Sequence, residues 1–156
     1  MKTAEIKTTS AEHTLAIARR FAGALQGGEI IFLKGPIGAG KTVFVKGVAQ
    51  ALGLKSSPTS ASFSLMKEYK NKHTRLFHID LFRLEEGEMF NLGFEEMLED
   101  DRAIILAEWP GPAERMFPQD RLEMNFILEE ADRRTIVLTA SGRVSERLLE
   151  ALCQAA

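Results

Sequence analysis

Residues 35–42 of this 156-residue chain read Gly-Pro-Ile-Gly-Ala-Gly-Lys-Thr, which matches the Walker A pattern of phosphate-binding loops. Glycines have no Cβ atom, so such a loop can adopt positive φ angles and turn successive backbone N–H groups toward phosphate oxygens. Lys41 would add a mobile positive charge to the outer phosphates, and Thr42 a hydroxyl for a bridging Mg²⁺ ion. The predicted nucleotide-binding residues in this segment are Gly35, Ile37, Gly38, Ala39, Gly40, Lys41, Thr42 and Val43.

Two carboxylates follow apolar runs further along the chain. Asp80 comes after residues 76–79 in a Walker B arrangement, in which a carboxylate at a strand end meets the magnesium shell. Glu108 follows residues 103–107 and would lie at the carboxyl edge of a sheet, where α/β proteins bind ligands. Glu108 could bind the metal or orient the attacking water, and we favour the metal because the cation needs several oxygen ligands. The predicted metal ligands are Thr42, Asp80 and Glu108, and the predicted catalytic residues are Lys41, Asp80 and Glu108.

A histidine and a tryptophan accompany these carboxylates. His78 and Asp80 are two residues apart and share one face of a strand, which is compatible with a proton relay. A half-buried structural histidine fits this position better. Trp109 follows Glu108 directly and is either a packing residue or a gate to the site.

The chemistry requires a buried strand before the loop and a helix after it. Residues 29–33 form a short apolar run rich in branched side chains, which predicts such a strand. A helix over about 41–52 follows, and its N-terminus would add partial positive charge at the phosphates. Helical spacing of apolar residues predicts another helix over 11–26, capped by one of the hydroxyl residues 8–10.

The remaining segments predict strands, short helices and turns. We expect a loop at 53–62, paired strands at 63–69 and 75–81 with a turn at 71–72, helical pieces within 85–101, a buried strand at 103–107, a loop at 110–112, an antiparallel hairpin at 122–128 and about 136–138, and a helix at 146–154. This order indicates an α/β protein, a single P-loop NTPase domain over residues 1–156. Its central sheet would be mostly parallel, with antiparallel additions and helices on both faces.

The composition is that of an ordinary globular protein, with 45% hydrophobic and 27% charged residues. The formal net charge of -2 disfavours tight unaided binding of RNA, which usually requires a basic excess. The one cysteine, Cys153, excludes an internal disulfide. No apolar run forms a signal-peptide core or is long enough to span a membrane, so we expect a cytoplasmic protein without a membrane partner.

Several further motifs accompany the loop: residues 63–65 with Tyr69, residues 78–84, Gly93, and Glu108-Trp109-Pro110. Together with residues 33–44 they resemble, nearly end to end, the bacterial TsaE (YjeE) family, the ATPase component of the tRNA threonylcarbamoyladenosine pathway. The resemblance implies a central sheet flanked by helices, ATP and Mg²⁺ as ligands, and weak ATP hydrolysis by the isolated chain. It also implies binding to the TsaB and TsaD proteins, which perform the transfer to tRNA, and hydrolysis that supports repeated turnover of that complex.

The resemblance also implies roles for single residues. Carried over by position, Lys41 and Thr42 bind phosphate and magnesium, while Asp80 and Glu108 serve the metal and the water. Trp109 lies beside these groups and is a predicted nucleotide-binding residue. A strand-to-helix junction at Ser10 and Ala11 lies near the nucleotide base.

The chain departs from the family pattern at several positions. The family commonly has an acidic residue at Pro36 and a second threonine at Val43, so a hydroxyl contact to phosphate is lost. Its switch segment, Ser-Pro-Thr followed by an aromatic residue, matches this chain in two registers. We prefer the register that makes Ser62 the switch hydroxyl and a nucleotide-binding residue, because it keeps the following aromatic positions in step. Thr59 is the alternative.

These features predict an ATP-binding and ATP-hydrolysing subunit of the tRNA N6-threonylcarbamoyladenosine (t6A37) machinery, completed by a partner and meeting tRNA only through the complex. The alternative is a small-molecule P-loop kinase, although no arginine-rich lid is evident, since Arg133 and Arg134 fall in the predicted hairpin. A GTPase is disfavoured because residues 71–74 lack the aspartate of the base-selecting Asn-Lys-x-Asp motif. A further alternative is an assembly module that holds a nucleotide without turning it over.

Overall fold

The computed structural model describes residues 1–56, 66–81 and 93–154. In chain order the elements are β1 (Lys2–Thr8), α1 (Ala11–Ala24), β2 (Ile30–Lys34), α2 (Lys41–Ala51), β3 (Lys55–Ser56), β4 (Met66–Lys70), β5 (Arg75–Asp80), α4 (Phe94–Glu99), β6 (Ala103–Glu108), the 3-10 helix η3 (Gly111–Met116), β7 (Leu122–Leu128), β8 (Arg134–Ala140) and α5 (Arg143–Gln154).

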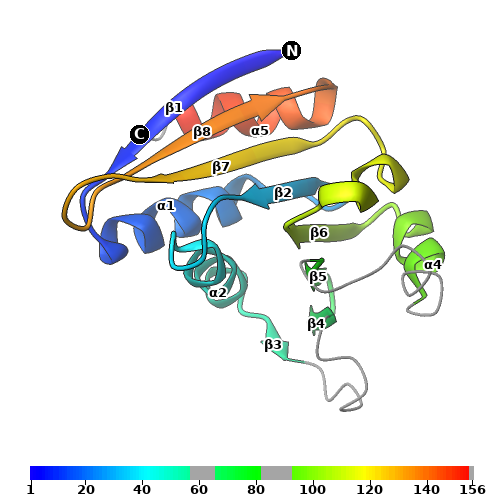
Figure 1. Ribbon diagram of the computed structural model, residues 1–156. Coiled ribbons are helices and arrows are strands. Elements are labelled where there is room, and N and C mark those ends of the chain that lie inside the picture. The colour runs from blue at the N-terminus through cyan, green and yellow to red at the C-terminus, as the bar shows by residue number, and fades with distance from the viewer. Residues whose placement is uncertain (57–65, 82–92, 155–156) are drawn as a thin grey trace.

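The strands form one eight-stranded sheet in the order β1-β8-β7-β2-β6-β5-β4-β3 (Figure 1). The central strands β7, β2, β6 and β5 run parallel to their neighbours in this group. Antiparallel pairs extend the sheet on both sides, β8 and β1 at one edge and β4 and β3 at the other. The predicted α/β class, with a parallel centre and antiparallel additions, is confirmed.

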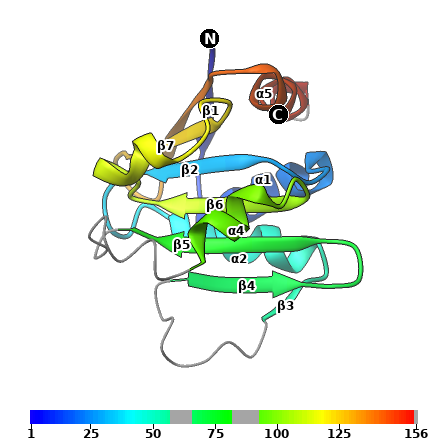
Figure 2. The ribbon, with the colours of Figure 1, turned by 90° about the vertical axis from the view of Figure 1, so that its right-hand side faces the viewer.

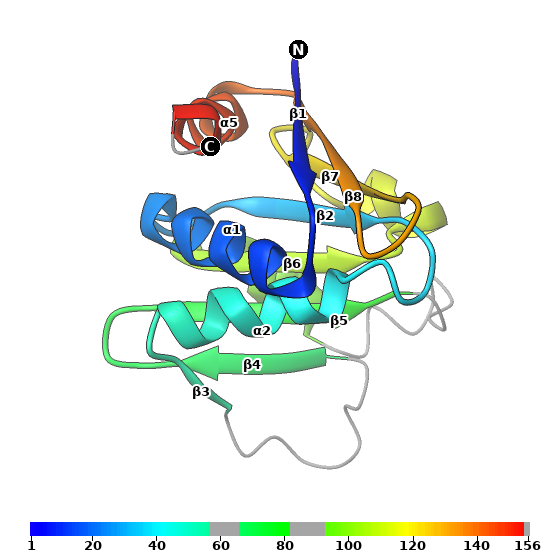
Figure 3. The same cartoon turned by 90° about the vertical axis from the view of Figure 1, so that its left-hand side faces the viewer.

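Helices cover both faces of the sheet. Helices α1 and α2 lie on the face that Figure 3 shows in front, and buried residues of α1, α2 and α5 pack there into one core. Figure 2 shows α4 on the opposite face, where buried residues of α4 and η3 form the second core. In that core Phe117 packs edge-on against Phe32 and Phe94, with ring centroids 5.0 Å and 4.9 Å apart. The strands between the two cores are buried on both sides, which explains the continuous apolar run of β2.

Most predicted elements are present at the predicted places. Both hairpins and both buried strands are confirmed, and Ser10 is the N-cap of α1, where its Oγ accepts from the N–H of His13 at 3.1 Å. Residues 63–65 of the predicted strand and 85–92 of the predicted helical segment lie outside the described residues. Within the described part of that segment, α4 is helical.

Three local features differ from what was expected from the sequence. No element was assigned to residues 2–8, yet β1 pairs with β8 along its whole length. As an edge strand it buries only Ile6 and Thr8, which leaves too short an alternation to stand out. Of the predicted loop at 53–62, residues 57–62 lie outside the described residues, and the described part contains the two-residue strand β3. The predicted loop at 110–112 runs into η3.

Helix α5 starts at Arg143, three positions before the predicted start at 146. The reason is a cap from a distant part of the chain, because the Asp120 carboxylate accepts from the N–H groups of Val144 at 2.9 Å and Ser145 at 3.0 Å. None of the described helices is both long and apolar enough to cross a lipid bilayer.

Candidate active site

The loop between β2 and α2 is built from glycines in left-handed conformations. Gly35, Gly38 and Gly40 have φ angles of 133°, 81° and 103°. A Cβ atom on Gly35 would lie 2.5 Å from the carbonyl oxygen of Phe126, so the loop can leave β2 at this point only with glycine. Gly40 caps α2 without a side-chain hydrogen bond, and the first N–H groups of an α-helix have no partner within the helix. The loop therefore presents backbone donors at a helix N-terminus, the arrangement that binds phosphate.

The ammonium group of Lys41 lies inside this loop. The Lys41 side chain is buried, and its Nζ donates to the carbonyl oxygens of Gly35 and, at 3.1 Å, Pro36. Nζ also lies 3.9 Å from the ring centroid of Trp109, in a cation–π contact. Burial lowers the pKa of Lys41 below its usual value, and the charges of Glu108 and Asp80 only partly oppose this effect. Ile37, at the outer turn of the loop, is 80% exposed.

The two predicted carboxylates lie side by side at the carboxyl edge of the sheet. Asp80 ends β5 and Glu108 ends β6, and the two are directly paired in the parallel register, so they share a face. The Thr42 hydroxyl donates to Oε1 of Glu108 at 3.3 Å. Among the described residues no group of three or more His, Cys, Asp or Glu side chains could hold a metal by itself. Oxygen atoms of Thr42, Glu108 and Asp80 nevertheless suit Mg²⁺, which takes its remaining ligands from water and substrate phosphate.

Glu108 is held at both oxygens. Its Oε2 lies 2.8 Å from Nε2 of His78, while Oε1 accepts from Thr42. Burial alone would raise the pKa of Glu108, but the hydrogen bond and charge of His78, the charge of Lys41 and the hydrogen bond from Thr42 together lower the pKa below the usual value. His78, which the sequence placed on the same strand face as Asp80, is thus a partner of Glu108.

Trp109 has a left-handed backbone, with a φ of 54°. This conformation is rare for a bulky side chain and costs of order 1–3 kcal/mol, so surrounding contacts must maintain it. One of these contacts is the hydrogen bond from the Trp109 N–H to the carbonyl oxygen of Leu33 at 3.2 Å. The backbone turn directs the indole ring onto Lys41.

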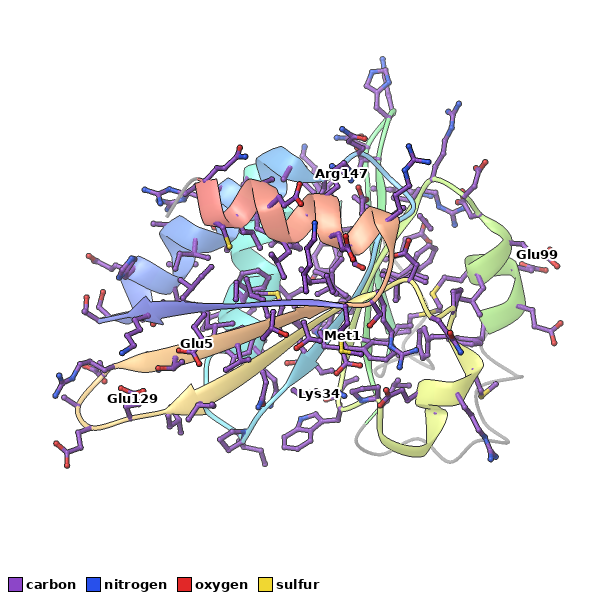
Figure 4. All side chains as sticks on the ribbon, turned by 90° about the horizontal axis from the view of Figure 1, so that it is seen from above. Met1, Glu5, Lys34, Glu99, Glu129 and Arg147 are labelled. Carbon is purple, nitrogen blue, oxygen red and sulfur yellow. The ribbon has the colours of Figure 1, made fainter. Side chains whose placement is uncertain are left out.

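An ion-pair network joins the strand before the loop to the segment after Trp109. Lys34, labelled in Figure 4 at the end of β2, pairs with Glu123 of β7 at 2.8 Å and with Glu114 of η3 at 3.4 Å. Arg121 pairs with the same two carboxylates, at 2.5 Å to Glu114 and 3.4 Å to Glu123. The network ties η3, which begins two residues after Trp109, to the strand that enters the loop.

The N-terminus of α1 lies near the Gly40 end of the loop. Thr14 donates from its hydroxyl to the carbonyl oxygen of Ser10 at 3.2 Å, and its Cγ2 lies 3.9 Å from the position of a Cβ on Gly40. Ser10 and the exposed Ala11 are therefore near the loop, as is Val43 in the first turn of α2, which is 38% exposed. Ser62 and the alternative Thr59 lie outside the described residues.

One residue near the loop was not among the predicted site residues. Arg134 begins β8 opposite Thr8, and its Nε lies 3.5 Å from the position of a Cβ on Gly40. Its terminal nitrogen donates to the Asp132 carbonyl oxygen at 3.1 Å, but Nε is buried and, among the described side chains, has no hydrogen-bond partner. The sequence places Arg134 in a hairpin but does not show that it lies beside Gly40, because this proximity depends on how β8 lies relative to α1 and β2.

Comparison with known proteins agrees with this architecture. Residues 8–136 match the family model described as threonylcarbamoyl adenosine biosynthesis protein TsaE. The chain belongs to the TsaE family. Family membership, predicted from the sequence motifs, is thereby confirmed.

Individual TsaE proteins are similar over most of their length. The protein named tRNA threonylcarbamoyladenosine biosynthesis protein TsaE in Bacillus subtilis (strain 168) is 36% identical over 97% of this chain and 95% of its own. The protein of the same name in Aquifex aeolicus (strain VF5) is 36% identical over 83% of this chain and 92% of its own. The crystal structure of Bacillus subtilis YdiB matches with a TM-score of 0.81 at 34% identity, over 99% of this chain and 96% of the other.

Proposed function

We propose that this TsaE-family chain binds and hydrolyses ATP with Mg²⁺ as a subunit of the t6A37 tRNA-modifying machinery. In this proposal residues 1–156 act as one domain in the cytoplasm. The chain supports repeated turnover of a TsaB–TsaD complex and meets tRNA only through that complex. Hydrolysis by the isolated chain is slow.

The observation that carries the proposal is the approach of Thr42 and Glu108 across the mouth of the loop. The hydroxyl and the carboxylate belong to α2 and β6, and they lie 3.3 Å apart beside a loop of backbone donors. These two oxygens and Asp80 would hold Mg²⁺, which would offset the charge of the outer phosphates. A glycine-rich turn without this function would not require a buried carboxylate facing its hydroxyl.

The nucleotide would lie across the end of β2. Asp80 and Glu108 belong to β5 and β6 on one side of β2, whereas Arg134 belongs to β8 on the other side. The outer phosphates would therefore face the carboxylates, and the nucleoside would face Arg134 and the N-terminus of α1. This orientation supports the assignment of Ser10 and Ala11 to the base.

Lys41 would move its hydrogen bonds from the loop carbonyls to the outer phosphates when a nucleotide binds. Its burial and its contact with Trp109 keep the ammonium group close to the loop, so only a small displacement is needed. Lys41 is one positive charge opposite two carboxylates, so the negative charge that develops in the transition state is only partly compensated. The isolated chain should therefore hydrolyse ATP slowly, and a partner that supplies a further cation should accelerate the reaction.

A reconstituted reaction tests the proposal. Purified protein with TsaB, TsaD, tRNA and ATP should modify many tRNA molecules per complex, and Lys41→Ala should reduce the reaction to about one turnover. Equal multiple-turnover yields with the alanine variant would disprove the proposed role of hydrolysis.

The kinase alternative makes a different prediction. A kinase would transfer the γ-phosphate to a metabolite instead of releasing inorganic phosphate. Arg134 approaches the loop from a hairpin and lies across β2 from the carboxylates, which is not the position of a lid over the outer phosphates. Phosphate release compared with transfer across a metabolite panel separates the two functions.

A further inference from the structure

His78 lies on β5 two residues before Asp80, on the face of the sheet that carries Glu108. In the parallel register His78 is opposite Leu106, so its ring reaches diagonally along the sheet to Glu108. Nε2 of His78 and Oε2 of Glu108 are 2.8 Å apart, and the two side chains are 12% and 6% exposed. The contact is short and almost completely removed from water.

The direction of this hydrogen bond follows from the state of Glu108. A glutamate carboxylate is normally ionised at neutral pH and can then only accept, and the two oxygens of Glu108 lie within hydrogen-bond distance of Oγ1 of Thr42 and Nε2 of His78. Nε2 of His78 must therefore carry the hydrogen atom. Charge-assisted hydrogen bonds of this kind are about twice as strong as those between neutral groups.

The hydrogen bond between His78 and Glu108 also orients the carboxylate of Glu108. Glu108 has two oxygens, and with Oε2 held by His78 the other oxygen points to the Thr42 hydroxyl. A glutamate has three side-chain torsions, so an unheld carboxylate would sample several orientations, and few of them face Thr42. Partners that orient a metal ligand in this way typically change metal affinity 10–100-fold when they are removed.

We infer that His78 is a positioning residue, whose Nε2–H holds the Glu108 carboxylate with its second oxygen toward Thr42, ready to bind a divalent cation. The inference rests on the proposed function, in which Thr42 and Glu108 share that cation. A positioning role requires the Nε2–H donor of His78, whereas a packing role would require only the apolar part of the imidazole.

The wild-type protein allows a first test by NMR. In protein labelled with ¹⁵N at histidine, the ring nitrogens of His78 should show a proton on Nε2 at neutral pH, whether or not Nδ1 is also protonated. The signal is assigned by its absence in His78→Gln. A ring protonated only on Nδ1 cannot donate to Glu108, and this result would overturn the inference.

Two substitutions separate donation from packing. His78→Leu keeps a buried apolar side chain but removes the donor, whereas His78→Gln keeps an N–H group at similar reach. The probe is Mn²⁺, titrated into the ADP-bound protein and followed by electron paramagnetic resonance. We expect about 10-fold weaker Mn²⁺ binding for His78→Leu and a change of less than about threefold for His78→Gln. His73→Leu, at an exposed turn position, is the matched control and should bind Mn²⁺ as wild type does.

Affinity for ADP without metal should be the same in all three variants, because the loop amides and Lys41 are unaltered. Unchanged Mn²⁺ affinity in His78→Leu, or a loss that glutamine does not restore, would show that the histidine serves only for packing. Should His78→Leu not fold, the NMR result and the glutamine variant still decide. A wild-type protein that binds ADP and Mn²⁺ but hydrolyses no ATP would refute the proposed function alone, without affecting the role of His78.

Discussion

The Thr42 hydroxyl and Oε1 of Glu108 lie 3.3 Å apart, although 66 positions separate the two residues in the chain. The parallel pairing of β2 with β6 causes this approach, since Leu33 pairs with Glu108 and the loop begins two residues after Leu33. A carboxylate at the end of the strand next to β2 is thereby directed at the first turn of α2. The predictions that follow concern this contact and the elements that support it.

Glu108→Gln should nearly abolish hydrolysis. The amide keeps the size of the side chain but removes the negative charge that a divalent cation needs, so we expect a loss on the order of 100-fold in the ATPase rate. Nucleotide affinity in the absence of Mg²⁺ should not fall, because Lys41 and the loop amides are unaltered. Phosphate-release assays and metal-free calorimetry measure the two quantities, and a variant with normal hydrolysis would remove Glu108 from the proposed chemistry.

Arg134→Ala should weaken ATP binding by about 10-fold or more, because a hydrogen bond to a charged group contributes roughly 1.5–3 kcal/mol. The motivation is the buried Nε of Arg134, which lies beside Gly40 and has no hydrogen-bond partner among the residues that the structure describes. Arg133→Ala is the matched control, since the side chain of the exposed Arg133 makes a long local hydrogen bond of 3.4 Å to the carbonyl oxygen of Glu130. If calorimetry finds the same affinity loss in both variants, the effect is one of net charge and Arg134 has no specific role.

Gly35→Ala should destabilise the protein more than Gly38→Ala. Both glycines have positive φ angles, so each alanine should cost about 1 kcal/mol of unfolding free energy from backbone strain alone. Only at Gly35 would the new Cβ also collide with the Phe126 carbonyl oxygen, at 2.5 Å, whereas at Gly38 no atom of the described part of the chain lies within 4 Å of it. Urea unfolding measures the difference, and equal losses would contradict the close approach of the loop to β7.

Asp120→Asn should destabilise the fold at neutral pH and less so in acid. The Asp120 carboxylate caps α5 through Val144 and Ser145, and loss of such a cap costs about 1 kcal/mol. Burial opposes ionisation of Asp120, but the hydrogen bonds from Ser145 and Val144 outweigh it and lower the pKa below the usual 3.8. A lowered folded-state pKa means that the stabilisation is fully present above pH 3.8 and is lost as the pH falls through the folded pKa.

The difference in unfolding free energy between wild type and Asp120→Asn should therefore shrink below pH 3.8. Unfolding by urea at pH 7 and at lower pH values measures it. A difference that stays constant over this range would mean that the carboxylate charge does not contribute to the cap.

The amino-acid sequence by itself determined the elements and the family. The phosphate-binding loop can be predicted from local spacing alone, because the glycines, Lys41 and Thr42 are neighbours in the chain. Their chemistry depends on backbone conformations that those residue types specify. Apolar runs likewise marked the buried strands and placed Asp80 and Glu108 at strand ends. The strand β1 was not predicted, because an edge strand buries few side chains and its alternation of apolar and polar residues is short.

Only the tertiary structure decided which of these groups meet. The sequence placed His78 and Asp80 on one face of a strand, and the fold brings the imidazole to Glu108 of the neighbouring strand. It also brought Arg134 from a hairpin to Gly40 and Asp120 to the start of α5. These contacts depend on strand order, register and the direction of side chains across the sheet, which arise when the whole chain buries its apolar surface on both faces and which no single segment encodes.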